Sequence, residues 1–129
     1  MKQTFTKAER LCSKLLIERL FESGHTFNLF PFRVIWLMEK RDSPFPAQIA
    51  FSVPKRTFSR AVDRNLLKRR SREAYRKNKF RLYECLKSQD QFLAVILIYT
   101  AKEKILYDVA ENKINQVIDR LIKEASCVK

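Results

Sequence analysis

The chain has 129 residues, 46% of them hydrophobic, and a formal net charge of +13. This length and composition suit one globular domain, spanning residues 1–129, and exclude a chain that is disordered throughout. So large a positive excess predicts a polyanionic partner, nucleic acid first and an anionic membrane surface second. No stretch approaches the roughly 20 apolar residues of a membrane-spanning helix, and the N-terminus lacks the apolar segment of a secretory signal. We therefore predict a cytoplasmic protein with no membrane association.

The first half of the chain predicts one helix and two strands. Residues 11–22 favour a helix, because apolar residues pair at a spacing of four and Gly24 stands where a C-terminal cap belongs. Residues 32–38 and 48–53 read as strands. Residues 40–46, with two prolines, read as the polar turn between them.

Alternation along these two strands separates two surfaces. The large apolar side chains share one surface, which we predict to be core: Phe32, Val34, Trp36, Ile49, Phe51 and Val53. The other surface carries Arg33, Ile35, Leu37, Ala50 and Ser52. Two readings of this second surface are open. It is either a shallow cleft that binds single-stranded nucleic acid, with Phe21 or Tyr99 as a stacking platform at its edge, or a second helix-covered face.

The positive charge is concentrated in residues 55–81. This segment holds 12 basic residues against Asp63 and Glu73, which is +10 in 27 residues, while the rest of the chain is only +3. The segment contains no Gly or Pro between Ser59, a fair N-cap, and Arg81. It predicts one helix in which Asp63 lies in the first turn and offsets the helix dipole.

Basic residues recur every four positions on this helix and form a ridge that winds slowly around it. The ridge consists of Arg60, Arg64, Lys68, Arg72 and Arg76, widened by Asn65 and Arg69, while Val62, Leu66, Leu67 and Ala74 can face the protein. Like charges at this spacing repel by ~0.2–0.5 kcal/mol per pair, which Glu73 can relieve toward Lys77 and Arg70. A merely solvated face normally mixes signs. We therefore predict that phosphates are the missing counter-charges of this ridge.

The second half adds a strand and a helix. Residues 92–99 form the longest apolar run, which predicts a central strand. Ile114, Val117, Ile118 and Leu121 give the stripe of an amphipathic helix. The order is α-β-β-α-β-α with room for one further short strand, which indicates an α+β class with a small sheet covered by helices.

The sequence offers no catalytic or metal-binding constellation. Cys12, Cys85 and Cys127 are far apart and odd in number, which predicts free thiols in a reducing compartment rather than a zinc site. His25 follows Gly24 in a predicted turn and is not expected to be catalytic. The single glycine excludes a Gly-rich phosphate loop, and the scattered acidic residues do not predict a two-metal site. We expect no catalytic residue, no metal ligand and no protein-bound cofactor.

Residues 51–56 and 60–75 resemble the signature of the bacterial ribonuclease P protein component, whose core is A-V-x-R-N-x-x-K-R-x-x-R-E. All eight fixed positions of this pattern match: Ala61, Val62, Arg64, Asn65, Lys68, Arg69, Arg72 and Glu73. The resemblance implies an α/β sandwich of order αβββαβα with a small mixed sheet. It also implies a left-handed β-α-β crossover through the basic helix, against the strong right-handed default.

The resemblance further implies a subunit of an endoribonuclease that removes the 5′ leader of precursor tRNA. Its partners are then the catalytic RNA subunit, which carries the Mg²⁺ ions and the chemistry, and precursor tRNA, with no obligate protein partner. Residues implied or predicted to contact the RNA subunit are Lys55, Arg56, Arg60, Arg64, Asn65, Lys68, Arg69, Arg72 and Arg76. Those of the leader cleft are Phe21, Arg33, Ile35, Ser52 and Tyr99.

Two departures from the family pattern stand out. Ile17 and Ile35 occupy positions where other members often carry aromatic residues, which predicts weaker leader stacking. The loop at residues 57–60 lacks the glycine that many members have there, and it reads as one residue longer than theirs. Two other functions fit the residues less well: a stand-alone RNA-binding module of the translation machinery, such as a ribosomal or RNA-chaperone protein, and a metal-dependent nuclease that acts alone.

Overall fold

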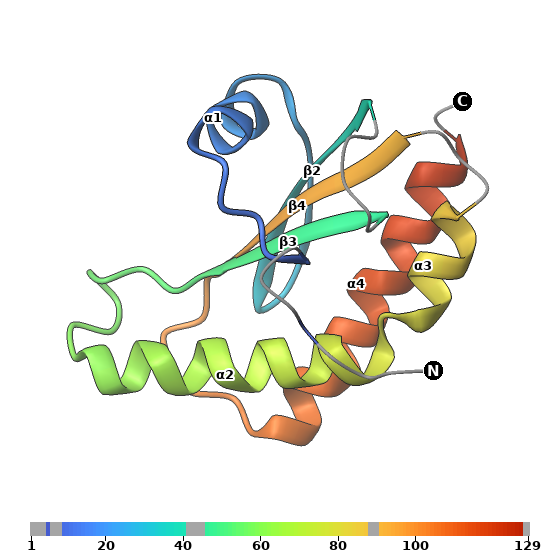
Figure 1. Cartoon of the computed structure of the whole chain (residues 1–129). Coiled ribbons are helices and arrows are strands. Elements are labelled where there is room, and N and C mark those ends of the chain that lie inside the picture. The colour runs from blue at the N-terminus through green and yellow to red at the C-terminus, as the bar shows by residue number, and fades with distance from the viewer. Residues whose placement is uncertain (1–4, 6–8, 41–45, 88–90, 128–129) are drawn as a thin grey trace.

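The computed structural model describes residues 5, 9–40, 46–87 and 91–127. Its elements are α1 (Lys14–Ser23), β1 (His25–Leu29), β2 (Phe32–Lys40), β3 (Ala47–Ser52), α2 (Ala61–Asn78), α3 (Phe80–Leu86), β4 (Gln91–Tyr99) and α4 (Tyr107–Cys127) (Figure 1). The strands form one mixed sheet of order β1-β2-β4-β3. This confirms the α+β prediction, and β4 is an inner strand as expected. The residues between β2 and β3 that were predicted as a turn lie mostly outside the described ranges.

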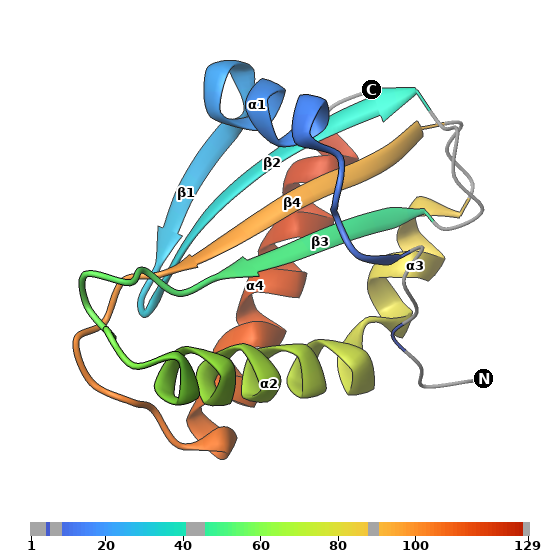
Figure 2. The same ribbon diagram turned by 60° about the vertical axis from the view of Figure 1, so that its left-hand side comes forward.

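The parallel strands are joined by an unusual crossover. β3 pairs with β4 in parallel, whereas β2 pairs with β1 and β4 antiparallel. In Figure 2 both parallel strands run from right to left, β4 lies above β3, and α4 passes behind them. α2 shares a core with α4 on that far side. Viewed from the helices with the strands pointing up, the chain moves leftward from β3 to β4, so the crossover is left-handed.

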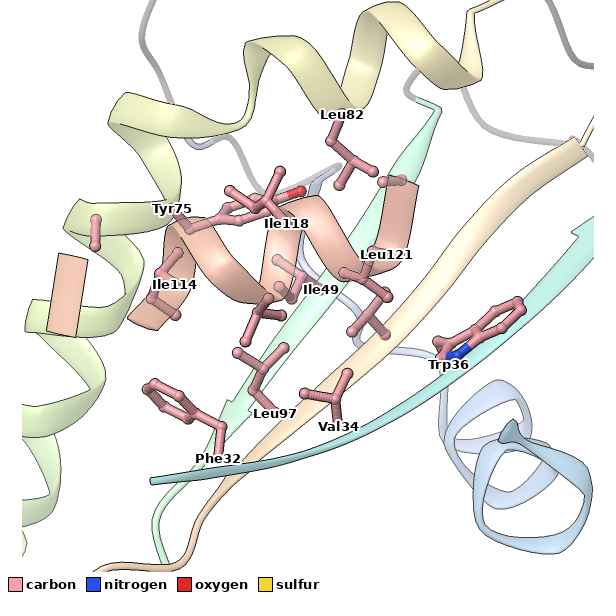
Figure 3. Close-up of a cluster of buried hydrophobic side chains, with 14 of the residues drawn as sticks. Phe32, Val34, Trp36, Ile49, Tyr75, Leu82, Leu97, Ile114, Ile118 and Leu121 are labelled. Atoms are coloured by element: carbon pink, nitrogen blue, oxygen red, sulfur yellow. The ribbon is translucent and has the colours of Figure 1, made fainter. Parts of the chain in front are cut away.

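The two faces of the sheet are covered to different extents. Helices α2, α3 and α4 pack on one face and enclose the main core, in which Leu121 of α4 points toward Val34 of the sheet and Ile118 of α4 lies beside Tyr75 (Figure 3). Among the helices that the structure describes, α1 alone lies on the other face, over a smaller cluster that includes Leu20. The predicted parity is confirmed, because the β2 and β3 side chains expected in the core join the main cluster.

The further short strand for which the sequence left room is β1. The basic helix differs from the sequence prediction at both ends. It ends at Asn78, after which α3 begins a separate helix. The break lets α3 pack on α4, where Arg81 donates to the backbone carbonyl of Asn115 at 2.9 Å. The N-cap of α2 is Arg60 rather than Ser59, and it makes no side-chain capping bond. The Ser59 carbonyl instead accepts a hydrogen bond from Arg64 at 2.9 Å.

Gly24 ends α1, as predicted. The reason is not a left-handed backbone conformation, which is the usual reason for a glycine at the end of a helix. Its φ and ψ are −69° and 152°, and its N–H donates to the Leu20 carbonyl at 2.9 Å. A Cβ at this position would lie 2.7 Å from Cγ2 of Ile35 and would also clash with the Leu20 carbonyl. Glycine is therefore required by the close approach of α1 to β2.

Candidate nucleic-acid interface

Helix α2 has one face in the core and the opposite face in solvent. Its buried residues are Leu67, Ser71, Ala74 and Tyr75, which recur at helical spacing and pack toward the sheet and α4. The Ser71 hydroxyl is satisfied within the helix, where it donates to the Leu67 carbonyl at 2.9 Å. This buried stripe fixes the rotation of α2, so the basic residues on the rest of the helix surface point away from the core.

The predicted basic ridge is largely accessible. Arg60, Arg69 and Arg72 are exposed, and Lys68 is half-buried. Within the described parts of the chain, none of these four forms an ion pair with a carboxylate. Asn65 is also exposed, beside the ridge. These side chains therefore present positive charge and hydrogen-bond donors to solvent, although Asp63 attracts Arg60 without forming an ion pair with it.

Both acidic residues of the basic segment are already engaged. Asp63 pairs with Lys104, which comes from the loop after β4, at 2.6 Å. Glu73 accepts from Arg76, with Nε and Oε2 3.1 Å apart, and is attracted more weakly by Lys77, one of the two residues toward which relief was predicted. These hydrogen bonds hold the pKa of each carboxyl below its usual value. Of the ridge residues, only Arg76 is therefore partnered by a carboxylate of its own helix.

The loop before α2 folds back on itself. The Pro54 carbonyl accepts from the N–H groups of Thr57 and Phe58, at 3.2 and 3.1 Å. Phe58 is buried in the main core, and its carbonyl accepts from Arg64 at 2.8 Å. Arg64 therefore supports the loop as well as belonging to the ridge. Lys55 and Arg56 remain exposed in this loop.

Two apolar residues of α2 that were predicted to face the protein lie at least partly in solvent. Val62 is 60% exposed, and Leu66 is half-buried; both line a shallow hollow of about 600 Å³ with Asn65, Arg69 and Arg72. The prediction that Val62 faces the protein is wrong, because the contacts of Leu67 and Ala74 turn it outward. The solvent face of α2 is therefore basic with an apolar patch.

The less covered face of the sheet is open at one end and covered at the other. Cross-strand pairing aligns Ser52, Ile98, Arg33 and Asn28 in one row across the sheet. Arg33 and Asn28 are exposed, and Ser52 and Ile98 are half-buried. Further along, Leu16 and Leu20 of α1 cover Ile35, Ala94 and Ile96. This face is therefore covered by a helix at one end and open at the other, and its binding of single-stranded nucleic acid stays a prediction.

Three residues predicted to line the cleft differ from one another in how far the fold exposes them. Phe21, on α1, is 58% exposed and available for stacking. Ile35 lies on the expected face, but it is only 4% exposed beneath α1, so it supports the surface rather than contacting a ligand. The prediction for Tyr99 is wrong. Tyr99 lies on the helix-covered face and packs against Phe32 and Phe58, because it pairs with Phe32 of β2 and shares that residue's face.

The fold adds polar residues that sequence reasoning missed. Lys104 reaches the first turn of α2 through its pair with Asp63, and Asn28 joins the open row through β1. Lys104 carries no local signal, because its proximity to α2 depends on a contact between distant segments. A prediction of β1 would have revealed Asn28.

The described ranges also place the histidine and two of the three cysteines. No cluster of three His, Cys, Asp or Glu residues there could hold a metal ion. His25 is exposed, with its ring 4.6 Å from that of Trp36. Cys12 and Cys85 are free thiols. Among the helices of the described segments, none is both long and apolar enough to cross a membrane.

The fold and this surface define a class: a small α+β protein that presents a basic helix within a left-handed crossover. Comparison with known proteins identifies the family. The Ribonuclease P family model matches residues 5–125, so the chain belongs to the ribonuclease P protein family. Membership makes it an RNA-binding protein of tRNA processing and a component of an endoribonuclease.

Individual relatives agree with this assignment. The ribonuclease P protein component of Porphyromonas gingivalis is 29% identical over 116 residues, which cover 90% of this chain and 85% of that protein. That of Nitrosococcus oceani is 32% identical over 72 residues, 56% of this chain and 58% of the other.

Solved structures share the fold. The RNase P proteins of Staphylococcus aureus and Thermotoga maritima each superpose with a TM-score of 0.64 at 22% identity. The first comparison covers 88% of this chain and 95% of the other, and the second 87% and 96%.

Proposed function

We propose that this protein is the subunit of ribonuclease P that docks its basic helix on the catalytic RNA and receives the 5′ leader of precursor tRNA on the open end of its sheet. Hydrolysis belongs to the RNA and its Mg²⁺ ions. The protein binds the RNA subunit and the leader, orients them, and screens the charge of their phosphates. The product is a tRNA with a mature 5′ end.

The observation that carries this proposal is the exposed part of the ridge, whose arginines form no ion pair with a described carboxylate. Arg60, Arg69 and Arg72 project from a helix whose rotation is fixed by its core contacts. Arginine suits phosphate because its planar fork forms two parallel charge-assisted hydrogen bonds. An RNA backbone placed along α2 therefore supplies the anions that the protein itself does not provide.

The open row of the sheet supports the second half of the proposal. Arg33 and Ser52 offer polar contacts, Ile98 offers an apolar surface, and Phe21 offers an aromatic face. Single-stranded nucleic acid is bound by this combination of basic groups and stacking platforms. Ile35 stands buried where an aromatic residue is common in the family, so one aromatic side chain, Phe21, serves for stacking there.

Reconstitution tests the function directly. Purified protein is mixed with precursor tRNA at low Mg²⁺, with and without a bacterial ribonuclease P RNA. We expect cleavage at the mature 5′ end only when protein and RNA are both present. Binding without stimulated cleavage would instead select a stand-alone RNA-binding module, and cleavage by the protein alone would select a nuclease that needs no RNA subunit.

Neutralising the ridge tests the docking assignment. Arg60, Arg69 and Arg72 replaced together by Gln should weaken assembly with the RNA, because the three exposed side chains lack carboxylate partners. The matched control replaces Lys87, which follows the last residue of α3, and Lys113 and Lys123 of α4 by Gln. Both triple variants lose three charges, so equal losses of affinity would show that net charge rather than the ridge governs binding.

Salt dependence measures how many phosphates are involved. If about six to ten phosphates are neutralised, affinity should fall ~10³–10⁵-fold between about 50 and 200 mM salt, by reasoning from duplex DNA. The ridge triple variant should flatten this dependence by about three in the log–log slope. A wild-type affinity that hardly changes with salt would contradict binding through phosphates.

A further inference from the structure

A short N-terminal segment, residues 9–11, lies along the free edge of β3. The N–H of Leu11 donates to the Ile49 carbonyl at 3.0 Å, and Arg10 forms a parallel bridge with Ile49. Both ribbon views show this dark blue segment passing β3 before it enters α1 (Figures 1 and 2). It therefore closes part of an edge that would otherwise expose unpaired backbone groups.

The segment is fixed by burial on both sides of Arg10. Glu9 is fully buried, forms an ion pair with Lys79 at the α2–α3 junction, and accepts from the Tyr83 hydroxyl at 2.5 Å. Leu11 is buried in the cluster beneath α1. Glu9 is thus anchored on the helix side of the sheet and Leu11 on the other side, while Arg10 between them is exposed.

Arg10 lines a pocket that joins the two surfaces already described. The pocket has a volume of about 260 Å³, and its lining includes Phe5, Arg10, Cys12, Ala50, Phe51 and Arg72. Arg72 belongs to the ridge of α2, and Ala50 belongs to the less covered face of the sheet, where it packs beside the cluster under α1. The pocket thus lies between the basic helix and the face proposed to receive single-stranded RNA.

The chemistry of the pocket combines cationic and aromatic groups. The guanidinium carbon of Arg10 lies 5.7 Å from the centre of the Phe5 ring, and this ring packs edge-on against Tyr75 at 5.8 Å. Arg10 and Arg72 are both exposed, and no described residue forms an ion pair with either. A planar guanidinium held over an aromatic ring offers a flat surface for a base, and a second guanidinium nearby suits its phosphate.

We propose that this pocket binds one unpaired nucleotide, whose base stacks on Arg10 over Phe5 and whose phosphate pairs with Arg72. The inference rests on the proposed function and adds a site to it. The buried Glu9–Lys79 pair acquires a role, because it holds the segment that presents Arg10. The nucleotide comes from a loop of the RNA subunit or from the leader, which share this chemistry.

Substitutions at Arg10 test the site, with Lys123→Gln as a control for loss of one exposed charge. Arg10→Gln should weaken RNA affinity about fivefold or more, the lower range for a lost stacking contact, and reduce the salt slope by up to about one. The Arg10→Lys variant should also bind RNA more weakly, because lysine lacks the planar guanidinium group. Its salt slope should be unchanged, because lysine keeps the positive charge. Thermal melting should be unchanged in both, since Arg10 is exposed.

Cys12 allows the bound nucleotide to be mapped. With Cys85 and Cys127 replaced by serine, a photoreactive azidophenacyl group is attached to Cys12, and the control carries the group at Lys123→Cys with Cys12 also replaced. We expect the Cys12 probe to cross-link to unpaired nucleotides. Reactions with RNA subunit alone, and with precursor tRNA added, show whether those nucleotides belong to the RNA subunit or to the leader.

The outcomes separate this inference from the function on which it rests. If wild-type protein neither binds nor stimulates the RNA, the proposed function fails. If wild-type protein is active, but Arg10→Gln matches Lys123→Gln and the Cys12 probe cross-links no better than the probe at 123, the pocket is refuted and the function stands.

Discussion

The two faces of the sheet share one backbone but serve different purposes. On the helix side, Val34 and Leu97 are at most 1% exposed and pack against α4. On the other side, only one residue removed along each strand, Arg33 is exposed and Ile98 is half-buried. The first face holds the protein together, whereas the second leaves polar and apolar groups available to a ligand.

The difference shows how a small protein can combine stability with a binding surface. Because strand side chains alternate, the same strand can supply a core residue and a contact residue at consecutive positions. Helix α2 repeats this division around its circumference, with Tyr75 buried and Arg72 exposed. Substitutions on one side should therefore affect folding, and those on the other should affect RNA binding.

The largest effect is expected from a matched pair on β4. Leu97→Ala should lower the free energy of unfolding by ~2–5 kcal/mol, because it leaves a cavity in the main core. Ile98→Ala, on the open face, should cost only about 1 kcal/mol. Chemical denaturation of both variants measures the contrast, and equal costs would show that the open face is as tightly packed as the helix side.

Gly24→Ala should come next, with a loss of ~1–3 kcal/mol. The added methyl group would collide with Ile35 and with the Leu20 carbonyl, so α1 would have to move away from the sheet. Ser23→Ala, at the exposed last residue of α1, is the control and should change stability by less than about 0.5 kcal/mol. A Gly24→Ala protein as stable as the wild type would mean that α1 is free to shift.

Phe21→Ala should affect binding while leaving stability unchanged. Loss of a stacking platform costs ~1–3 kcal/mol per base, so precursor tRNA should bind roughly five- to 150-fold more weakly, whereas mature tRNA should not be affected. Leu15→Ala removes another exposed apolar side chain of α1 and serves as the comparison. If both variants bind the leader equally well, Phe21 is not the platform.

The smallest effect concerns alkaline pH. Burial raises the pKa of Tyr75 above its ordinary value of 10.0, so the unfolded chain loses this proton at lower pH than the folded protein. The stabilisation is complete below about pH 10 and is lost as pH rises toward the folded pKa, at up to ~1.4 kcal/mol per pH unit. Tyr75→Phe should flatten this decline in denaturation curves above pH 10, and an unchanged slope would contradict the burial argument.

Much of the fold followed from local patterns. Alternation in β2 and β3 predicted which side chains enter the core, and the apolar run at 92–99 predicted the inner strand. The errors arose where distant segments decide. The end of α2 depends on the packing of α3 against α4, and the face of Tyr99 depends on its pairing with β2.

By itself, the sequence determined the basic helix, its signature residues and the α+β class, because charge, spacing and periodicity are properties of neighbouring residues. The tertiary structure alone decided that Ile35 is covered, that Val62 is exposed, and that Arg10 and Arg72 line one pocket at the edge of β3. These outcomes depend on contacts between segments far apart in the chain, whose geometry is fixed only when the core has formed.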